Sequence, residues 1–247
     1  HFKVPVTLGL QRLASYSRRE HAPALVIQSA RVRECLPGLL EDHQLPFLAP
    51  AVEPRLWVGN KATTPTHFDS MRNIACVLCG ARRFTLFPPE QLPNLYIGPL
   101  DFAPTGAAIS LARLDRPDDP RYPRLKQALA AAQAVELHPG DAIYIPPLWW
   151  HNVESLQQLN ALMNYWWNPV DVPGYNSGYA RAALFHCLLA FRELPPAERE
   201  QWRRLLDYYV FGGEEAVAHI PEHRRGVLGP QTPEIVEKLK EGARQNL

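Results

Sequence analysis

Two short segments, far apart in the chain, constrain its fold more than any other feature. The first, THFD, contains His67 and Asp69, and the second, PPLWWHNVES, contains His151, which lies 82 residues after Asp69. Residues two apart in an extended strand point to the same face and lie about 7 Å apart, so His67 and Asp69 can converge on one ion. His151 can join them only if a neighbouring strand pairs with theirs. The pattern therefore predicts a β-sheet fold that holds a metal by two imidazoles and one carboxylate.

The sequence around these residues is typical of β structure. LWVGNKATTPTHFD indicates a strand, a Gly-Asn turn and the start of a second strand, and NIACVLCGARRFTLFPP indicates two strands joined at Gly80. HPGDAIYIPP indicates a turn at Pro139, Gly140 and Asp141, followed by a strand over residues 142–145. An isolated His-x-Asp is common on surface strands, but its position among predicted strands favours the metal site.

These motifs, in this order and followed by MNYWWNP, resemble the JmjC or cupin-8 family of Fe(II)- and 2-oxoglutarate-dependent oxygenases over roughly residues 55–170. Within it, the chain is most similar to the subgroup of the asparaginyl hydroxylase that inhibits hypoxia-inducible factor. The resemblance implies a mainly β fold, the double-stranded β-helix or jelly roll of cupins. It also implies Fe(II) as cofactor, 2-oxoglutarate as cosubstrate, and hydroxylation of a protein or peptide side chain with release of succinate and CO₂.

The resemblance also assigns roles to individual residues. His67, Asp69 and His151 match the three iron ligands, which makes them the candidate catalytic residues. Four further residues match the cosubstrate pocket: Thr64, whose hydroxyl would bond the distal carboxylate, Asn73, Asn164 and the aromatic wall residue Trp166. Asn73 follows His67 by six residues, an even offset that we expect to keep both on one face of the same strand.

Arg82 departs from the family pattern. Much of the family has a Lys fifteen residues after the first His, where this chain has Arg82 followed by Arg83. A guanidinium can bind a carboxylate bidentately, so we expect Arg82 to bind the cosubstrate, and the alternative is a charge on a surface strand. The subgroup also uses an upstream Tyr that cannot be assigned here, although Tyr16 is the one early Tyr.

Composition narrows the class of partner. The chain has 247 residues with 26 basic and 25 acidic side chains, and this balance does not favour binding to nucleic acid or a membrane surface. Four Cys do not make a disulfide framework in a chain of this length, and no apolar run is long enough to span a membrane. We therefore expect a cytoplasmic protein. Cys76 and Cys79 face opposite sides if they lie on a strand, which favours structural burial over a zinc site.

The chain is expected to form two parts: a jelly-roll domain over residues 1–172 and a helical extension over residues 173–247. An α/β lead-in, with a helix at VTLGLQRLASY and a strand at APALVIQSA, precedes the sheets. Between Pro88 and Gln133 a Pro-rich segment is incompatible with regular strand pairing and ends in a predicted helix, KQALAAAQA. This segment either serves the active site or covers a sheet edge, and the sequence does not choose between them.

Three helices are predicted after Pro173, in YARAALFHCLLAFREL, AEREQWRRLLDYYVF and TPEIVEKLKEG, the last with Thr232 as its N-cap. The resemblance implies a homodimer that pairs through these helices, and the alternative is that they pack on their own barrel. Two other functions stay open: a metal-binding cupin that acts as a non-catalytic binding or regulatory module, and a Zn²⁺ or Mn²⁺ hydrolase or isomerase. The substrate is either a protein or peptide or a small molecule.

Overall fold

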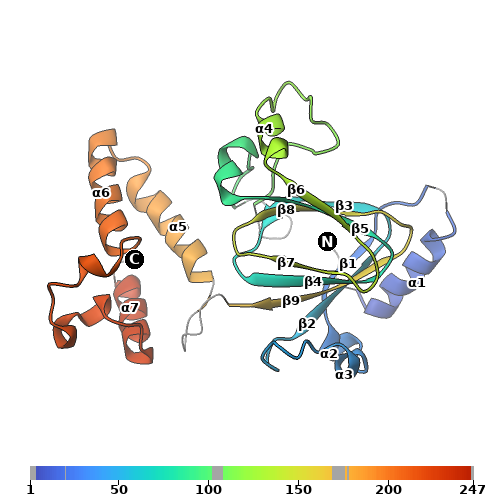
Figure 1. Ribbon diagram of the computed structural model, residues 1–247, viewed down its shortest axis with the longest axis horizontal. Helices are drawn as coiled ribbons and strands as arrows, with labels where there is room; N and C mark the ends of the chain where they lie inside the picture. Colours follow the sequence, from blue (N-terminus) through green and yellow to red (C-terminus); the bar gives the residue numbers. More distant parts are fainter. Residues whose placement is uncertain (1–3, 20, 102–107, 169–175, 177, 246–247) are drawn as a thin grey trace. The chain divides into compact units, whose positions relative to one another are not determined.

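The fold is described from a computed structural model, which covers residues 4–19, 21–101, 108–168, 176 and 178–245. The chain divides into two compact units, residues 1–167 and residues 168–247, and each is described by itself (Figure 1). The predicted domain boundary between residues 172 and 173 lies outside the described residues.

The first unit is built on nine strands. They are β1 (Val26–Arg31), β2 (Pro54–Gly59), β3 (Ala62–Phe68), β4 (Arg72–Cys79), β5 (Arg82–Phe87), β6 (Gln133–Leu137), β7 (Ala142–Ile145), β8 (Trp150–Ser155) and β9 (Asn160–Trp167). Its helices are α1 (Val6–Tyr16), α2 (Val32–Cys35), α3 (Leu39–Asp42), the 3-10 helix η1 (Pro89–Asn94) and α4 (Leu125–Ala130). The predicted helix and strand of the lead-in are confirmed, as are the strands on either side of Gly80 and the strand over residues 142–145.

These strands form two antiparallel sheets, of five strands in the order β1-β2-β9-β4-β7 and of four strands in the order β3-β8-β5-β6. Alternate residues of both sheets point inward and form one apolar core. Its buried members are Ala75, Val77, Phe84, Leu86, Leu137, Ile145, Val153 and Leu162. Two facing antiparallel sheets around a shared core are consistent with the predicted jelly roll.

Gly80 connects the two sheets, because it joins β4 of the larger sheet to β5 of the smaller one. Its φ of +78° lies in the left-handed region that residues with a Cβ rarely adopt. A Cβ at this position would lie 2.5 Å from the Leu159 carbonyl oxygen and 2.5 Å from Asn160 Oδ1. The turn therefore requires glycine, and it determines where β5, with Arg82 as its first residue, begins.

The lead-in covers the outer face of the five-stranded sheet, where α1–α3 lie beside β1 and β2 (Figure 1). Leu13 and Val32 pack against Leu56 and Met163, and the Tyr165 hydroxyl donates a hydrogen bond to the carbonyl of His43. This layer shields outward-facing residues of β2, β4 and β9 from solvent, whereas Tyr144 on the edge strand β7 is 49% exposed.

The Pro-rich segment packs on the outer face of the four-stranded sheet, and its residue Ile109 forms a β-bridge to His67 on the edge strand β3. The predicted cover of a sheet edge is therefore confirmed for the described residues. Leu95 and Leu125 pack against Phe87 and Trp150. Near the edge strand β3, Ser110 donates its backbone N–H to the Thr66 carbonyl at 2.8 Å, next to His67. The segment therefore also supports the backbone of one predicted metal ligand.

One helix prediction was too long. KQALAAAQA was expected to be helical throughout, but α4 ends at Ala130 and β6 begins at Gln133. Gln133 and Ala134 pair with Leu86 and Thr85 of β5. Sheet pairing, a tertiary interaction, overrides the helix propensity of Ala and Gln at these two positions.

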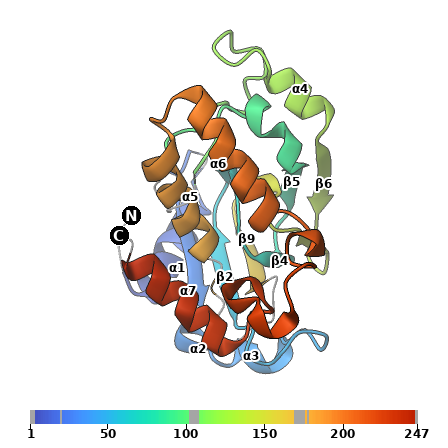
Figure 2. The same cartoon turned by 90° about the vertical axis from the view of Figure 1, so that its left-hand side faces the viewer.

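The second unit contains the three predicted helices, α5 (Gly178–Phe191), α6 (Pro196–Tyr209) and α7 (Pro233–Gln245), with short 3-10 helices at Glu214–Ala216, Glu222–Arg224 and Gly226–Leu228. Helices α5 and α6 lie side by side (Figures 1 and 2), and Phe191 stacks on Trp202 with ring centroids 5.2 Å apart. The predicted N-cap is confirmed, because the Ile235 N–H lies 3.4 Å from Thr232 Oγ1. Within the described residues of both units, every helix is too short or too polar to cross a membrane.

Candidate metal centre and adjoining cavity

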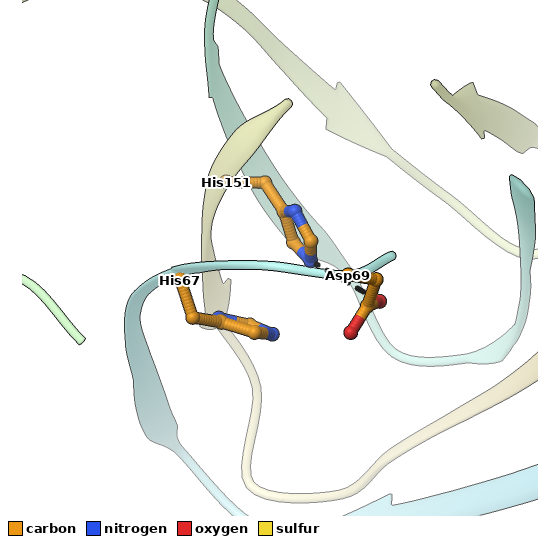
Figure 3. Close-up of side chains that lie close together, drawn as sticks. All are labelled: His67, Asp69 and His151. Carbon is orange, nitrogen blue, oxygen red and sulfur yellow. Dashed lines mark ion pairs between the residues drawn. The ribbon is translucent and has the colours of Figure 1, made fainter. Parts of the chain in front are cut away.

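His67, Asp69 and His151 come together at one end of the cavity between the two sheets. His67 on β3 pairs directly with His151 on β8, which confirms that sheet pairing brings the distant histidine to the first segment. The candidate ligand atoms of the three residues lie within 4.8 Å of one another, and their side chains point toward a common point (Figure 3). Asp69 lies just past the end of β3 rather than within it, and its carbonyl accepts a 2.9 Å hydrogen bond from the backbone N–H of Leu148.

The backbone orients both imidazoles. His67 Nδ1 lies 2.8 Å from the Pro65 carbonyl and His151 Nδ1 lies 3.1 Å from the Trp149 carbonyl. A proton on Nδ1 satisfies these carbonyls and leaves the lone pair of Nε2 for a metal. Burial, together with the nearby His67, lowers the pKa of His151 to about 4, so this imidazole is neutral at pH 7, as a metal ligand must be.

A chain of hydrogen bonds holds the carboxylate of Asp69. Trp166 Nε1 donates to Asp69 Oδ2 at 3.1 Å, and Asn73 Nδ2 donates to the same oxygen at 3.4 Å. Asn164 Nδ2 in turn donates to Asn73 Oδ1 at 2.7 Å, and both Asn side chains are buried. Asn73, Asn164 and Trp166 were predicted to belong to the cosubstrate pocket. In the structure they line the cavity, and their hydrogen bonds orient Asp69.

The expected position of Asn73 on the strand of His67 was wrong. The chain leaves β3 at Phe68 and enters β4 at Arg72, in the other sheet. Asn73 pairs there with Ile145 and Trp166. The even offset of six residues assumed one continuous strand, and a turn between the sheets breaks that periodicity.

The cavity beside the triad encloses about 390 Å³ of space that continues into solvent. Both sheets line it, through Trp57, Thr64, His67, Asp69, Asn73, Arg82, Phe84, Ile145, His151, Val153, Leu162, Asn164 and Trp166. All the residues predicted for the metal and the cosubstrate are in this group. The apolar walls and Trp57 were missed. Alternation along the strands was the signal that could have found two of them, because Val153 lies two residues after His151 and Phe84 two residues after Arg82.

Arg82 is buried, with 5% of its surface exposed, so the alternative of a surface charge is wrong. Burial lowers its pKa to about 10, which leaves the guanidinium charged at pH 7. In the part of the chain that the structure describes, its Nε and Nη2 are buried and have no hydrogen-bond partner. The surface charge is Arg83, which lies 3.5 Å from both Glu136 and Glu154. A buried cation without a partner is costly, and an anion in the cavity would remove that cost.

Comparison with known proteins gives the family. Residues 2–172 match the cupin-like domain family. The chain belongs to this family. It is 34% identical over 112 residues to Lysine-specific demethylase JMJ31 of Arabidopsis thaliana, a match that covers 45% of the chain and 20% of that protein. It is 31% identical over 141 residues to Jumonji C domain-containing protein 5 of Drosophila melanogaster, covering 53% of the chain and 34% of that protein.

A third relative of this cupin-like chain is tRNA wybutosine-synthesizing protein 4 of Gibberella zeae, 28% identical over 156 residues, which are 60% of the chain and 14% of that protein. The chain thus matches about a third or less of the length of these relatives. The resemblance to JmjC cupin proteins is confirmed, and such proteins are typically Fe(II)- and 2-oxoglutarate-dependent oxygenases.

The side chains of the cupin-like chain have the chemistry needed to bind Fe(II) and 2-oxoglutarate. The imidazoles of His67 and His151 and the carboxyl group of Asp69 gather around one point beside an open cavity, which is the donor set and the access that a facial Fe(II) site needs. The unpaired guanidinium of Arg82 is what the anionic end of a dicarboxylate needs. The residues present therefore fit both the metal and the cosubstrate.

Proposed function

We propose that the chain is an Fe(II)- and 2-oxoglutarate-dependent dioxygenase that hydroxylates a protein or peptide side chain and releases succinate and CO₂. The observation that carries the proposal is the buried, unpartnered guanidinium of Arg82 in the same cavity as the triad. Such a cavity favours a ligand with a metal-chelating group at one end and an anion at the other. 2-Oxoglutarate has a keto acid at one end and a carboxylate at the other.

Each group of residues has a distinct part in this proposal. His67, Asp69 and His151 would hold Fe(II), which supplies the oxygen-activating chemistry when it is bound with cosubstrate. Arg82 binds the distal carboxylate through Nε and Nη2, and the resemblance adds the hydroxyl of Thr64. Four apolar walls, Phe84, Ile145, Val153 and Leu162, keep water from the space between the two ends.

The class of substrate is inferred from the family resemblance and from the charge of the chain. The names of the relatives include a lysine demethylase and a tRNA-modifying protein, so proteins similar to this chain differ in what they act on. Resemblance to the asparaginyl hydroxylase subgroup favours a protein or peptide side chain. A net charge of +1, with basic and acidic residues in near balance, favours such a substrate over nucleic acid.

Anaerobic reconstitution with Fe(II) and 2-oxoglutarate tests the proposal. We expect a weak visible metal-to-ligand band before oxygen is admitted and succinate afterwards, both of which Asp69→Ala abolishes. Metal binding without the band or succinate would favour the non-catalytic binding module. Turnover of a substrate under strict exclusion of oxygen would favour a hydrolase or isomerase.

A further inference from the structure

The indole N–H of Trp57 is a second unsatisfied donor in the same cavity. Trp57 lines the cavity, and its Nε1 is buried without a hydrogen-bond acceptor among the described residues. Two further buried atoms without a partner, Thr66 Oγ1 and Asn152 Oδ1, belong to residues that do not line the cavity. A buried N–H without an acceptor is unfavourable, and a ligand in the cavity can supply the missing acceptor.

Strand register places Trp57 and Arg82 at the same distance along the strands from the metal end of the cavity. In the four-stranded sheet, Arg82 pairs with Ser155, four residues along β8 from His151. In the five-stranded sheet, Trp57 pairs with Leu162, four residues along β9 from Trp166.

Trp166 marks the level of the metal site in the second sheet, because its Nε1 bonds Asp69. Trp57 and Arg82 therefore lie on facing sheets, the same number of residues from the metal end. Both side chains also line the one cavity, in which the Trp57 ring lies edge-on to the Trp166 ring with centroids 6.1 Å apart. A ligand that extends through the cavity from the metal end can therefore contact both Trp57 and Arg82.

We propose that Trp57 Nε1 donates a hydrogen bond to the distal carboxylate of the cosubstrate, beside the two donors of Arg82, and this inference rests on the proposed function. A carboxylate has about four lone-pair sites, so a bidentate guanidinium leaves room for a third donor. Arg82 and Trp57 both donate and neither accepts. The inner end therefore selects a carboxylate and rejects a methyl, amide NH₂ or ammonium group at the same position.

Trp57 also answers a question that the sequence left open. The family resemblance implies a Tyr upstream of the His-x-Asp segment, and none could be assigned. Tyr16 lies in α1 and does not line the cavity, and the described residues that do line it include no Tyr. Trp57 is the aromatic residue upstream of His67 that lines the cavity in the described structure.

The test compares two ligands that differ at the distal end. 2-Oxovalerate keeps the keto acid and the five-carbon chain of 2-oxoglutarate but ends in a methyl group. Affinities are measured by calorimetry without oxygen, in the presence of Mn²⁺, so that no turnover occurs. We expect Trp57→Phe to weaken the binding of 2-oxoglutarate by roughly tenfold or more. The affinities for 2-oxovalerate and for Mn²⁺ should stay unchanged. Trp202→Phe, on the exposed part of α6, is the matched control and should change none of the three.

The outcomes separate this inference from the proposed function. If Trp57→Phe weakens both ligands equally, or neither, Trp57 acts by packing or not at all and the inference is wrong, while the proposed function stands. If the unaltered chain binds Mn²⁺ but not 2-oxoglutarate, the proposed function fails and the inference fails with it. Should Trp57→Phe not fold, benzothienylalanine at position 57 keeps the ring volume and replaces N–H by sulfur, and the same difference between ligands decides.

Discussion

Single residues in this site work against the stability of the free protein. Arg82 is charged, buried and unpartnered at two of its nitrogens within the described structure. Replacing it by Met, of similar length and without charge, should raise the stability of the ligand-free protein by about 1–2 kcal/mol, because an uncompensated desolvation cost is removed. The same change should abolish measurable 2-oxoglutarate binding. Denaturant midpoints measure the gain in stability, and calorimetry measures the loss of 2-oxoglutarate binding.

Arg83→Met is the control for that prediction, since Arg83 is partly exposed and pairs with acidic residues on the outer face. It should change stability by less than about 0.5 kcal/mol and leave cosubstrate affinity intact. A gain of affinity in Arg82→Met, or a loss of stability as large as an ordinary core substitution, would contradict the assignment of Arg82 to an anion site.

Substitution of Trp166 tests how the candidate metal ligand Asp69 is held. Its indole donates to Asp69 Oδ2 at 3.1 Å, so Trp166→Phe should leave only the longer hydrogen bond from Asn73 on that oxygen and weaken metal binding about 10- to 100-fold. Titration with Mn²⁺ measures this loss. Trp150→Phe is the comparison, because Trp150 packs in the core beneath the Pro-rich segment. This substitution should lower the stability of the protein with little effect on its metal affinity. Equal metal affinities in both variants would show that the hydrogen bond to Asp69 has no such role.

For single residues, the sequence predicted the polar members of the candidate site but not the apolar ones. His67, Asp69 and His151 were recognisable from their spacing and the family motifs, and Arg82 from its place where much of the family has Lys. Alternation puts Phe84 and Val153 on the same faces as Arg82 and His151, but it does not show whether those faces line a cavity or a packed core. Trp57 was missed for the same reason, although its indole carries a polar group whose lack of a partner is visible only in three dimensions.

At the scale of elements, the turn at Gly80 should be the most sensitive connection between the sheets. Gly80→Ala forces a Cβ against the Leu159 carbonyl and the Asn160 side chain, at a positive φ of 78°. We expect a loss of about 2–4 kcal/mol, from backbone strain and from displacement of these atoms. Chemical denaturation measures the loss.

Gly140→Ala separates the two contributions. Gly140 has a φ of +99°, but a Cβ there would meet nothing within 4 Å among the described residues. This variant should therefore lose about 1 kcal/mol from backbone strain alone. Equal losses in the two variants would mean that steric contact at Gly80 contributes nothing.

The strands β1 to β5 and β7 were predicted because their apolar residues and their turn residues are local signals. The exceptions have non-local causes: β6 takes two residues from a run that favours helix because β5 offers them backbone partners, and Asn73 changes sheet because the chain turns after Asp69. Neither pairing can be read from a window of neighbouring residues. Register between distant strands was the information that the sequence lacked, and the level shared by Trp57 and Arg82 depends on it.

At the scale of the whole molecule, the second unit has strongly exposed apolar side chains. Leu189 on α5 is 81% exposed and Phe211, just after α6, is 78% exposed. Contact with another chain would remove such apolar surface from water. We propose, with the support of the family resemblance, that the chain is a homodimer that pairs through these helices.

Leu189→Asp and Phe211→Asp test the homodimer by putting a charge where an apolar contact is expected. In a C2 dimer each substitution occurs twice across the interface, so the cost of burying the charge is doubled and the dimer should dissociate at micromolar concentration. Light scattering on the full chain measures its mass. We expect a dimer for the unaltered chain and a monomer for the variants, with Mn²⁺ affinity unchanged because the three candidate metal ligands lie in the first unit. A monomeric unaltered chain whose stability falls in the variants would instead show that these helices pack on their own barrel, because a charge would then disturb an intramolecular contact.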